Sequence, residues 1–119
     1  MTYEHLLNTM GEFRVHSYTS ETGLVVECHG KLTSENALKL RDEVRKLIPN
    51  QKKISLDLKG VPQMDSTGLG AVATLYVSAR TRGCQIQVIN AAPQIRKLFS
   101  VTNLLLLFED VGRHGGKLV

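Results

Sequence analysis

The feature that most constrains the fold of this chain is a regular alternation of strand-like and helix-like segments. Apolar residues recur at a period of two in the former and of 3.6 in the latter. Connections of more than a dozen residues between the later strands indicate parallel pairing, with helices packed on the sheet. The sequence therefore predicts a single α/β domain with a mixed, mostly parallel sheet, in the order β-β-α-β-α-β-α-β. The predicted strands span residues 12–19, 22–29, 53–58, 85–90 and 105–108.

Three predicted helices lie between these strands, and capping residues mark their ends. Ser34 is expected to cap the first helix, which Pro49 and Asn50 end. The second helix, over residues 66–82, closes with two arginines and then Gly83, a pattern typical of helix C-termini. Pro93 suits the first turn of the third helix.

Length and composition favour one domain with its own core. The chain has 119 residues, of which 42% are hydrophobic, so it can fold without disulfides or a metal. Its longest apolar run, residues 104–108, is far shorter than the ~20 residues of a membrane helix. The first residues lack a basic leader and a long apolar stretch. We therefore expect a cytoplasmic domain over residues 1–119, with its core at about 13–110 and no direct membrane insertion.

The cysteines and histidines form no recognisable redox or metal pattern. Cys28 and Cys84 are far apart within apolar segments, so we expect buried free thiols. The four histidines lack the spacing of metal ligands. The sequence predicts neither a bound metal nor a cofactor.

The net charge of +4 raises the question of nucleic-acid binding. The fifteen Lys and Arg residues are scattered, however, and the chain has no Trp and no aromatic residues interleaved with the basic ones. A solvated basic surface, able to face an acidic protein partner, is the favoured interpretation. No nucleic-acid partner is predicted.

Residues 64–70, Met-Asp-Ser-Thr-Gly-Leu-Gly, stand where a predicted strand leads into the second helix. Asp65 suits the N-cap, where its carboxylate accepts from first-turn amides, and Ser66 then presents its hydroxyl at the exposed helix start. Gly68 and Gly70 weaken the first turn and leave room for something to approach the backbone. These features also fit a plain, well-capped turn with small residues for close packing.

Enzymatic interpretations find little support. The Gly68-x-Gly70-x-x-Ala73 pattern matches a dinucleotide fingerprint, but the next strand ends at Asn90, where an acidic residue is expected. The sequence shows no Ser-His-Asp or Cys-His arrangement. We therefore predict that the protein is not an enzyme.

Residues 55–99 resemble the STAS domain of bacterial anti-sigma-factor antagonists. Residues 65–70 match the family signature D-S-[ST]-G-L-G without a gap, and the resemblance extends over about residues 13–110, including Gly30-Lys31-Leu32. The resemblance implies the STAS fold. It also implies phosphorylation at Ser66, with Thr67 as the less favoured acceptor.

The resemblance further implies how such a protein acts. Unphosphorylated, it would bind an anti-sigma factor that is also a serine kinase, and so release a sigma factor for transcription. The kinase would supply ATP and Mg²⁺, a serine phosphatase would reverse the modification, and the chain would be a monomer or weak dimer. The implied partner-binding residues are Asp65, Ser66, Thr67, Gly68, Leu69, Gly70, Lys31 and Thr33.

Two departures from the family pattern bear on the partner. The family often has an acidic residue, Leu and Asp after the glycine that precedes the first helix, where this chain has Lys31, Leu32 and Thr33. Few residues follow Asp110, so we expect the C-terminal helix of the family to be missing or rudimentary. The alternative function is a non-enzymatic STAS docking subunit of a signalling scaffold or transport assembly.

Overall fold

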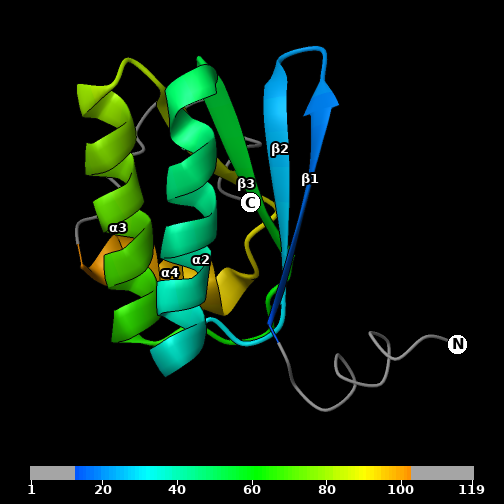
Figure 1. Ribbon diagram of the computed structural model, residues 1–119. Helices are drawn as coiled ribbons and strands as arrows, with labels where there is room; N and C mark the ends of the chain where they lie inside the picture. Colours follow the sequence, from blue (N-terminus) through cyan, green and yellow to red (C-terminus); the bar gives the residue numbers. More distant parts are fainter. Residues whose placement is uncertain (1–12, 103–119) are drawn as a thin grey trace, which may run out of the picture.

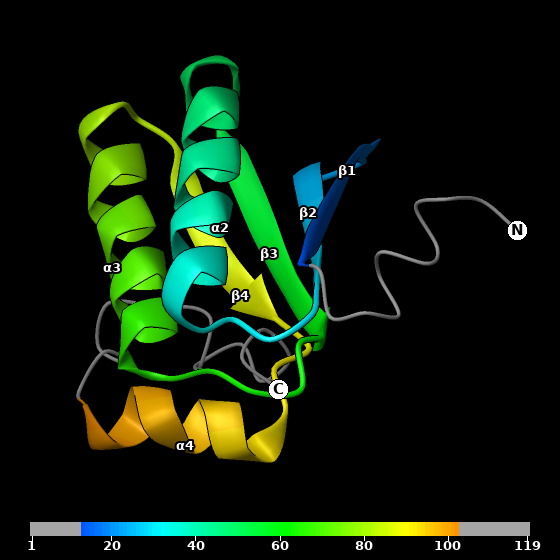
Figure 2. The ribbon, with the colours of Figure 1, turned by 60° about the horizontal axis from the view of Figure 1, so that its bottom comes forward.

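The computed structural model describes residues 13–102, which form a sheet with helices packed against it (Figure 1). Helices α2 and α3 lie side by side on one face of the sheet, and α4 crosses the end of the molecule at which they begin (Figure 2). The elements are β1 (Arg14–Ser20), β2 (Gly23–His29), α2 (Ser34–Leu47), a 3₁₀ turn (Ile48–Asn50), β3 (Lys53–Gly60), α3 (Ser66–Thr81), β4 (Gln85–Ile89) and α4 (Pro93–Val101).

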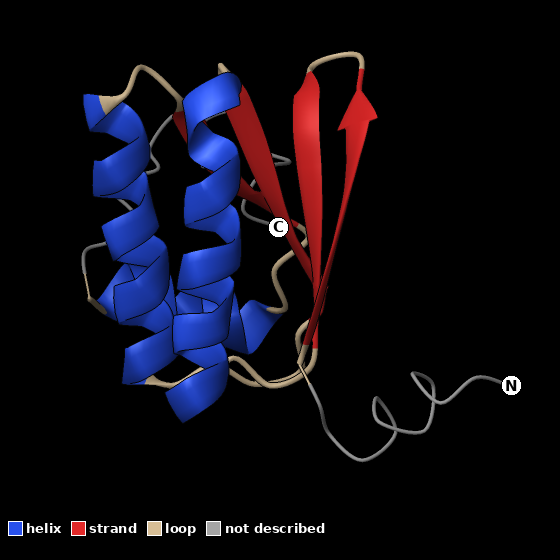
Figure 3. Cartoon of the chain, viewed as in Figure 1, coloured by secondary structure: helices blue, strands red, loops and turns tan. Residues whose placement is uncertain are grey.

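The described sheet has four strands in the order β1-β2-β3-β4 (Figure 3). The hairpin partners β1 and β2 are antiparallel, whereas β2, β3 and β4 run parallel, with Val26 opposite Leu56 and Leu56 opposite Val88. The mixed, mostly parallel sheet predicted from the sequence is therefore confirmed. The predicted strand at residues 105–108 and the C-terminal region beyond it lie outside the described residues.

Side chains along β3 alternate between the two faces of the sheet, and one set packs against helices α2 and α3. Ile54, Leu56 and Leu58 are completely buried and belong to the core that also contains the apolar faces of α2 and α3. Ser55 and Asp57 point to the opposite face because successive strand residues alternate. Both are also buried, so β3 is covered on its two faces, as a central parallel strand usually is.

The predicted start of the first helix needs a correction. Thr33 occupies the N-cap position without a side-chain cap, and Ser34 is the first helical residue, with φ of +45°. The reason is a tertiary contact, because the backbone amide of Ser34 donates to the Thr67 hydroxyl (3.0 Å). The helix ends at Leu47, and the residues predicted to end it belong to the 3₁₀ turn that follows.

The predicted bounds of the second helix and the predicted start of the third agree with the structure to within one residue. Helix α3 begins at Ser66 and ends at Thr81, and Gly83 follows with the left-handed φ of +75° that glycine adopts readily. Pro93 is the first residue of α4. Within residues 13–102, no helix combines the length and apolarity that crossing a bilayer requires.

Both cysteines are free and buried, as the sequence predicted. Burial, together with a smaller contribution from the nearby Asp57 carboxylate, raises the pKa of the Cys28 thiol to about 12. Burial also raises the pKa of Cys84. The two thiols are therefore packing groups at neutral pH and not nucleophiles.

The docking of α4 gives a first prediction. Ile95 is 1% exposed and part of the core, whereas its neighbour Arg96 is exposed. Ile95→Ala should lower the free energy of unfolding by about 2–5 kcal/mol, because it leaves a cavity in the core. Arg96→Ala, the matched control, should change it by less than about 0.5 kcal/mol. Urea denaturation measures both, and equal effects would show that α4 is not packed as described.

Candidate functional site

The loops that follow β2 and β3 lie together at the carboxyl end of the parallel strands. Their backbones are joined by hydrogen bonds from the Gly30 amide to the Gly60 carbonyl (3.0 Å) and from the Leu32 amide to the Gln63 carbonyl (2.9 Å). Leu32 also forms a parallel bridge with Met64. Sites in parallel sheets form at this end, so the two loops are the first place to seek function.

Asp65 caps α3 as predicted. Its Oδ1 accepts from the backbone amides of Thr67 (2.9 Å) and Gly68 (3.1 Å), and from the Thr67 hydroxyl. The hydroxyl hydrogen bond is the main cause of a pKa below the usual value for this carboxyl, and the Gly68 amide contributes next. Asp65 therefore stays ionised at the helix start.

The Thr67 hydroxyl joins the starts of two helices. It donates to the Asp65 carboxylate and accepts from the Ser34 amide at the first residue of α2. Its proton and an acceptor position are both in use, so it is part of the framework. The sequence predicts Thr67 as the alternative phosphorylation acceptor and as a partner-binding residue, but not as a link between two helices. The Ser34 amide that it binds lies 33 residues away, so the sequence carries no local signal of the contact.

Ser66 differs from its neighbour. It is the first residue of α3, its side chain is exposed, and its hydroxyl forms no hydrogen bond within the described part of the chain. A hydroxyl in this position can be reached by another molecule without disturbing an existing contact.

The two glycines of the motif have opposite surroundings. A Cβ on Gly68 would collide with the Leu32 carbonyl oxygen and lie 2.9 Å from Met64 Cγ, whereas a Cβ on Gly70 would have no atom within 4 Å. The room expected at both positions therefore exists only at Gly70. At Gly68 the group that approaches the backbone is the chain's own loop.

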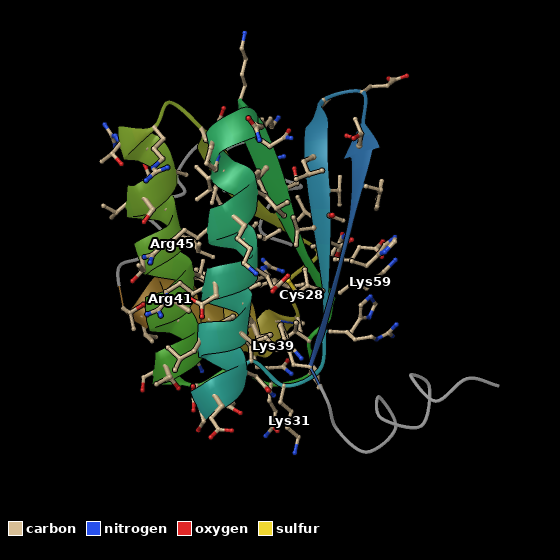
Figure 4. The ribbon with its side chains drawn as sticks, viewed as in Figure 1. Cys28, Lys31, Lys39, Arg41, Arg45 and Lys59 are labelled. Carbon is tan, nitrogen blue, oxygen red and sulfur yellow. The ribbon has the colours of Figure 1, made fainter. Side chains whose placement is uncertain are left out.

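The remaining predicted partner residues divide by exposure. Lys31 is exposed at the start of α2 (Figure 4), and its carbonyl accepts from Asn36 Nδ2 (2.9 Å). Thr33 is half-buried, whereas Leu69 is only 5% exposed and belongs to the core. The surface formed at this end by Lys31, Thr33, Ser66, Thr67 and Gly70 is called the motif surface below. Among residues 13–102, no group of three His, Cys, Asp or Glu side chains could hold a metal ion.

Comparison with protein families and known sequences gives a consistent result. The family model described as "Mlab, STAS domain" matches residues 17–107. The anti-sigma-B factor antagonist of Bacillus subtilis (strain 168) is 27% identical over 85 residues, which are 71% of this chain and 78% of that relative.

Solved structures share the fold. The anti-sigma factor antagonist SpoIIAA in its unphosphorylated form gives a TM-score of 0.64 at 23% identity, covering 78% of this chain and 82% of that one. The phosphorylated form of Bacillus SpoIIAA gives a TM-score of 0.62 at 20% identity, covering 78% of this chain and 85% of that one. The murine anion transporter Slc26a9 gives a TM-score of 0.64 at 17% identity. The match covers 86% of this chain but only 20% of that protein.

The contrast between the two glycines is testable. Gly68→Ala should destabilise the protein by about 1–3 kcal/mol, the usual cost of overpacking, because the Leu32 loop must move. Gly70→Ala should stabilise it by about 0.5–1 kcal/mol, since alanine favours the helix and meets nothing. Chemical denaturation of both variants decides the matter, and a tolerated Gly68→Ala would contradict the close approach.

The lowered pKa of Asp65 predicts a pH dependence. A carboxyl with a lowered folded-state pKa stabilises the fold above its unfolded-state value, near 3.8, and this contribution disappears as the pH falls through the folded-state pKa. Asp65→Asn keeps a residue suited to the N-cap but cannot ionise.

The stability difference between wild type and Asp65→Asn should therefore be largest at neutral pH and shrink below about pH 4. Thermal denaturation across this range measures it. A difference that is independent of pH would mean that the Asp65 charge does not contribute.

Proposed function

Because this chain belongs to the STAS domain family, we propose that it is an anti-sigma-factor antagonist controlled by phosphorylation of Ser66. In its unphosphorylated form it would bind an anti-sigma factor that is also a serine kinase, and thereby free a sigma factor. The observation that carries the proposal is the exposed Ser66 hydroxyl, free of hydrogen bonds within the described residues.

The hydrogen bonds of the motif favour Ser66 over Thr67 as the acceptor. Phosphorylation of Thr67 would remove its hydroxyl donor to Asp65 and disturb its contact with the Ser34 amide. Phosphorylation of Ser66 breaks no such contact. The relative and the structural neighbours named as anti-sigma factor antagonists support the role, and SpoIIAA exists in unphosphorylated and phosphorylated forms.

The electrostatics of the helix start indicate where phosphorylation acts. A phosphate adds about −1.5 to −2 charges at neutral pH, and a helix N-terminus accommodates an anion. The domain should therefore stay folded when Ser66 is modified. In a complex, however, the phosphate and the Asp65 carboxylate would both have to lose water against the partner, so the effect falls on binding.

The proposed interface is the motif surface, together with Asp65. Gly68 and Leu69 are buried, so they support this interface from the core side without being exposed to the partner. The exposed Lys31 favours a partner that presents an acidic side chain opposite this loop. The kinase supplies ATP, Mg²⁺ and the catalytic groups, so this chain acts as partner and substrate and not as an enzyme. A serine phosphatase would restore the active form.

A second candidate function follows from one structural neighbour. The same fold occurs within the anion transporter Slc26a9, of which this chain matches a fifth. A docking subunit of a transport or signalling assembly would use the motif surface as a permanent contact. In that case Ser66 would remain unmodified.

Variants of Ser66 test the proposal. Ser66→Ala should retain the fold and bind the kinase without becoming phosphorylated, whereas Ser66→Asp should weaken binding only in part, since it supplies one charge and a shorter reach. Ser100→Ala, an exposed serine on α4, is the control and should behave as wild type. Isothermal titration measures binding, and intact mass after incubation with kinase and ATP measures modification.

Two outcomes would redirect the proposal. A phosphate that maps to Thr67 would overturn the choice of acceptor while leaving a switch in place. If no phosphate is incorporated and Ser66→Asp binds as wild type does, the switch is wrong and the docking subunit takes its place.

A further inference from the structure

We propose that a cleft between the C-terminal turns of α2 and α3 binds a phosphate group, either free or on a small monoester. The cleft has a volume of about 240 Å³. Its walls come from the last turn of α2, the 3₁₀ turn that follows it and the end of α3, and its polar lining is basic or hydroxylic. The lining residues are Arg45, Ile48, Ser78, Thr81 and Arg82.

The two guanidinium groups lack carboxylate partners, which is the first observation behind the proposal. On α2, Asp42 pairs with Arg41 (3.2 Å) and Glu43 pairs with Lys46 (3.4 Å). Within the described part of the chain, neither Arg45 nor Arg82 has a carboxylate oxygen within 4.0 Å or a side-chain hydrogen bond. Two exposed arginine side chains therefore line one cleft without a carboxylate partner among the described residues.

The backbone carbonyls at the helix end do not serve as hydrogen-bond partners of these arginine side chains either. A cation at a helix C-terminus commonly satisfies the last carbonyls. At the end of α3, however, the Ala79 carbonyl accepts from the Arg82 and Cys84 amides (3.0 and 2.8 Å), and the Arg80 carbonyl accepts from the Gly83 amide (3.2 Å). The guanidinium N–H groups thus remain available to a ligand.

The two hydroxyl groups of the cleft, on Ser78 and Thr81, differ in whether their protons are already used in a hydrogen bond. Thr81 Oγ1 donates to the Ser78 carbonyl (2.9 Å), so its proton is used within the helix. The Ser78 hydroxyl has no hydrogen bond within residues 13–102 and can donate into the cleft. In Figure 4, Arg45 lies on the side of α2 that faces α3, which brings it toward the same opening.

The chemistry of these donors matches a phosphate. Two guanidinium groups balance a dianion, and their planar forks suit bidentate contacts with oxyanions. A carboxylate carries one negative charge, so it balances only one of the two arginines. The volume is below the roughly 300–1,000 Å³ of sites for drug-sized ligands, so the cleft suits a small anion such as phosphate.

The cleft is separate from the motif surface. Ser66 and Thr81 are the first and last residues of α3, so they lie about 22 Å apart along the helix axis. The inference therefore does not rest on the proposed function, and Ser66→Ala should leave phosphate binding unchanged.

Titration of the ¹⁵N-labelled full chain tests the proposal, at low ionic strength because salt screens such contacts. The probes are inorganic phosphate and glycerol 3-phosphate, with sodium acetate and sodium chloride as controls at equal ionic strength. We expect saturable shifts of the Ser78, Thr81 and Arg82 amides with the two phosphate probes. Equal affinities would identify the phosphate group as the whole ligand, and tighter binding of glycerol 3-phosphate would indicate a monoester.

Three variants assign the binding to the cleft. Arg45→Gln and Arg82→Gln should each weaken binding roughly tenfold or more, as loss of a charge-assisted hydrogen bond does. Arg41→Gln, which removes a paired arginine on the same helix and outside the cleft, should bind as wild type. Shifts that acetate or chloride reproduce, or that persist in Arg45→Gln and Arg82→Gln, would overturn the proposal.

Discussion

The structure depends on the close approach of two loops that are far apart in the sequence. The Leu32 carbonyl passes so near the first turn of α3 that position 68 has no space for a side chain. The Thr67 hydroxyl then links the Asp65 carboxylate to the Ser34 amide at the start of α2. These contacts fix the two helix starts relative to each other, and the exposed motif surface is a consequence of that arrangement.

This arrangement separates two adjacent hydroxyls that look equivalent in the sequence. Thr67 belongs to the framework, since its hydroxyl both donates and accepts within the fold. Ser66, one residue earlier, stands at the exposed helix start without such contacts among the described residues. A hydroxyl that is to be phosphorylated and dephosphorylated repeatedly is best placed where it makes no hydrogen bond that stabilises the fold. Ser66 meets that condition.

Local signals in the sequence were sufficient for the elements and for the cap. Alternating apolar residues predicted β3, and an aspartate before small residues predicted the start of α3 at Ser66. Contacts between distant residues were not predictable from one chain. The hydroxyl of Ser34 suits a helix cap, yet Thr33 occupies the N-cap position and the Ser34 amide donates to the distant Thr67 hydroxyl. The cleft at Arg45 and Arg82 was missed for the same reason, since only the packing of α2 beside α3 brings these arginines together.

The open space around Gly70 has a consequence for the partner. Because no atom lies within 4 Å of a Cβ at this position, the packing of the fold does not require a glycine here. Gly70 also lies one turn beyond Ser66, on the surface proposed to meet the partner. A glycine that the fold does not require, on a surface proposed to meet a partner, is explained by the partner's need for a close approach. A bulky side chain at position 70 would then block the complex while leaving the domain folded.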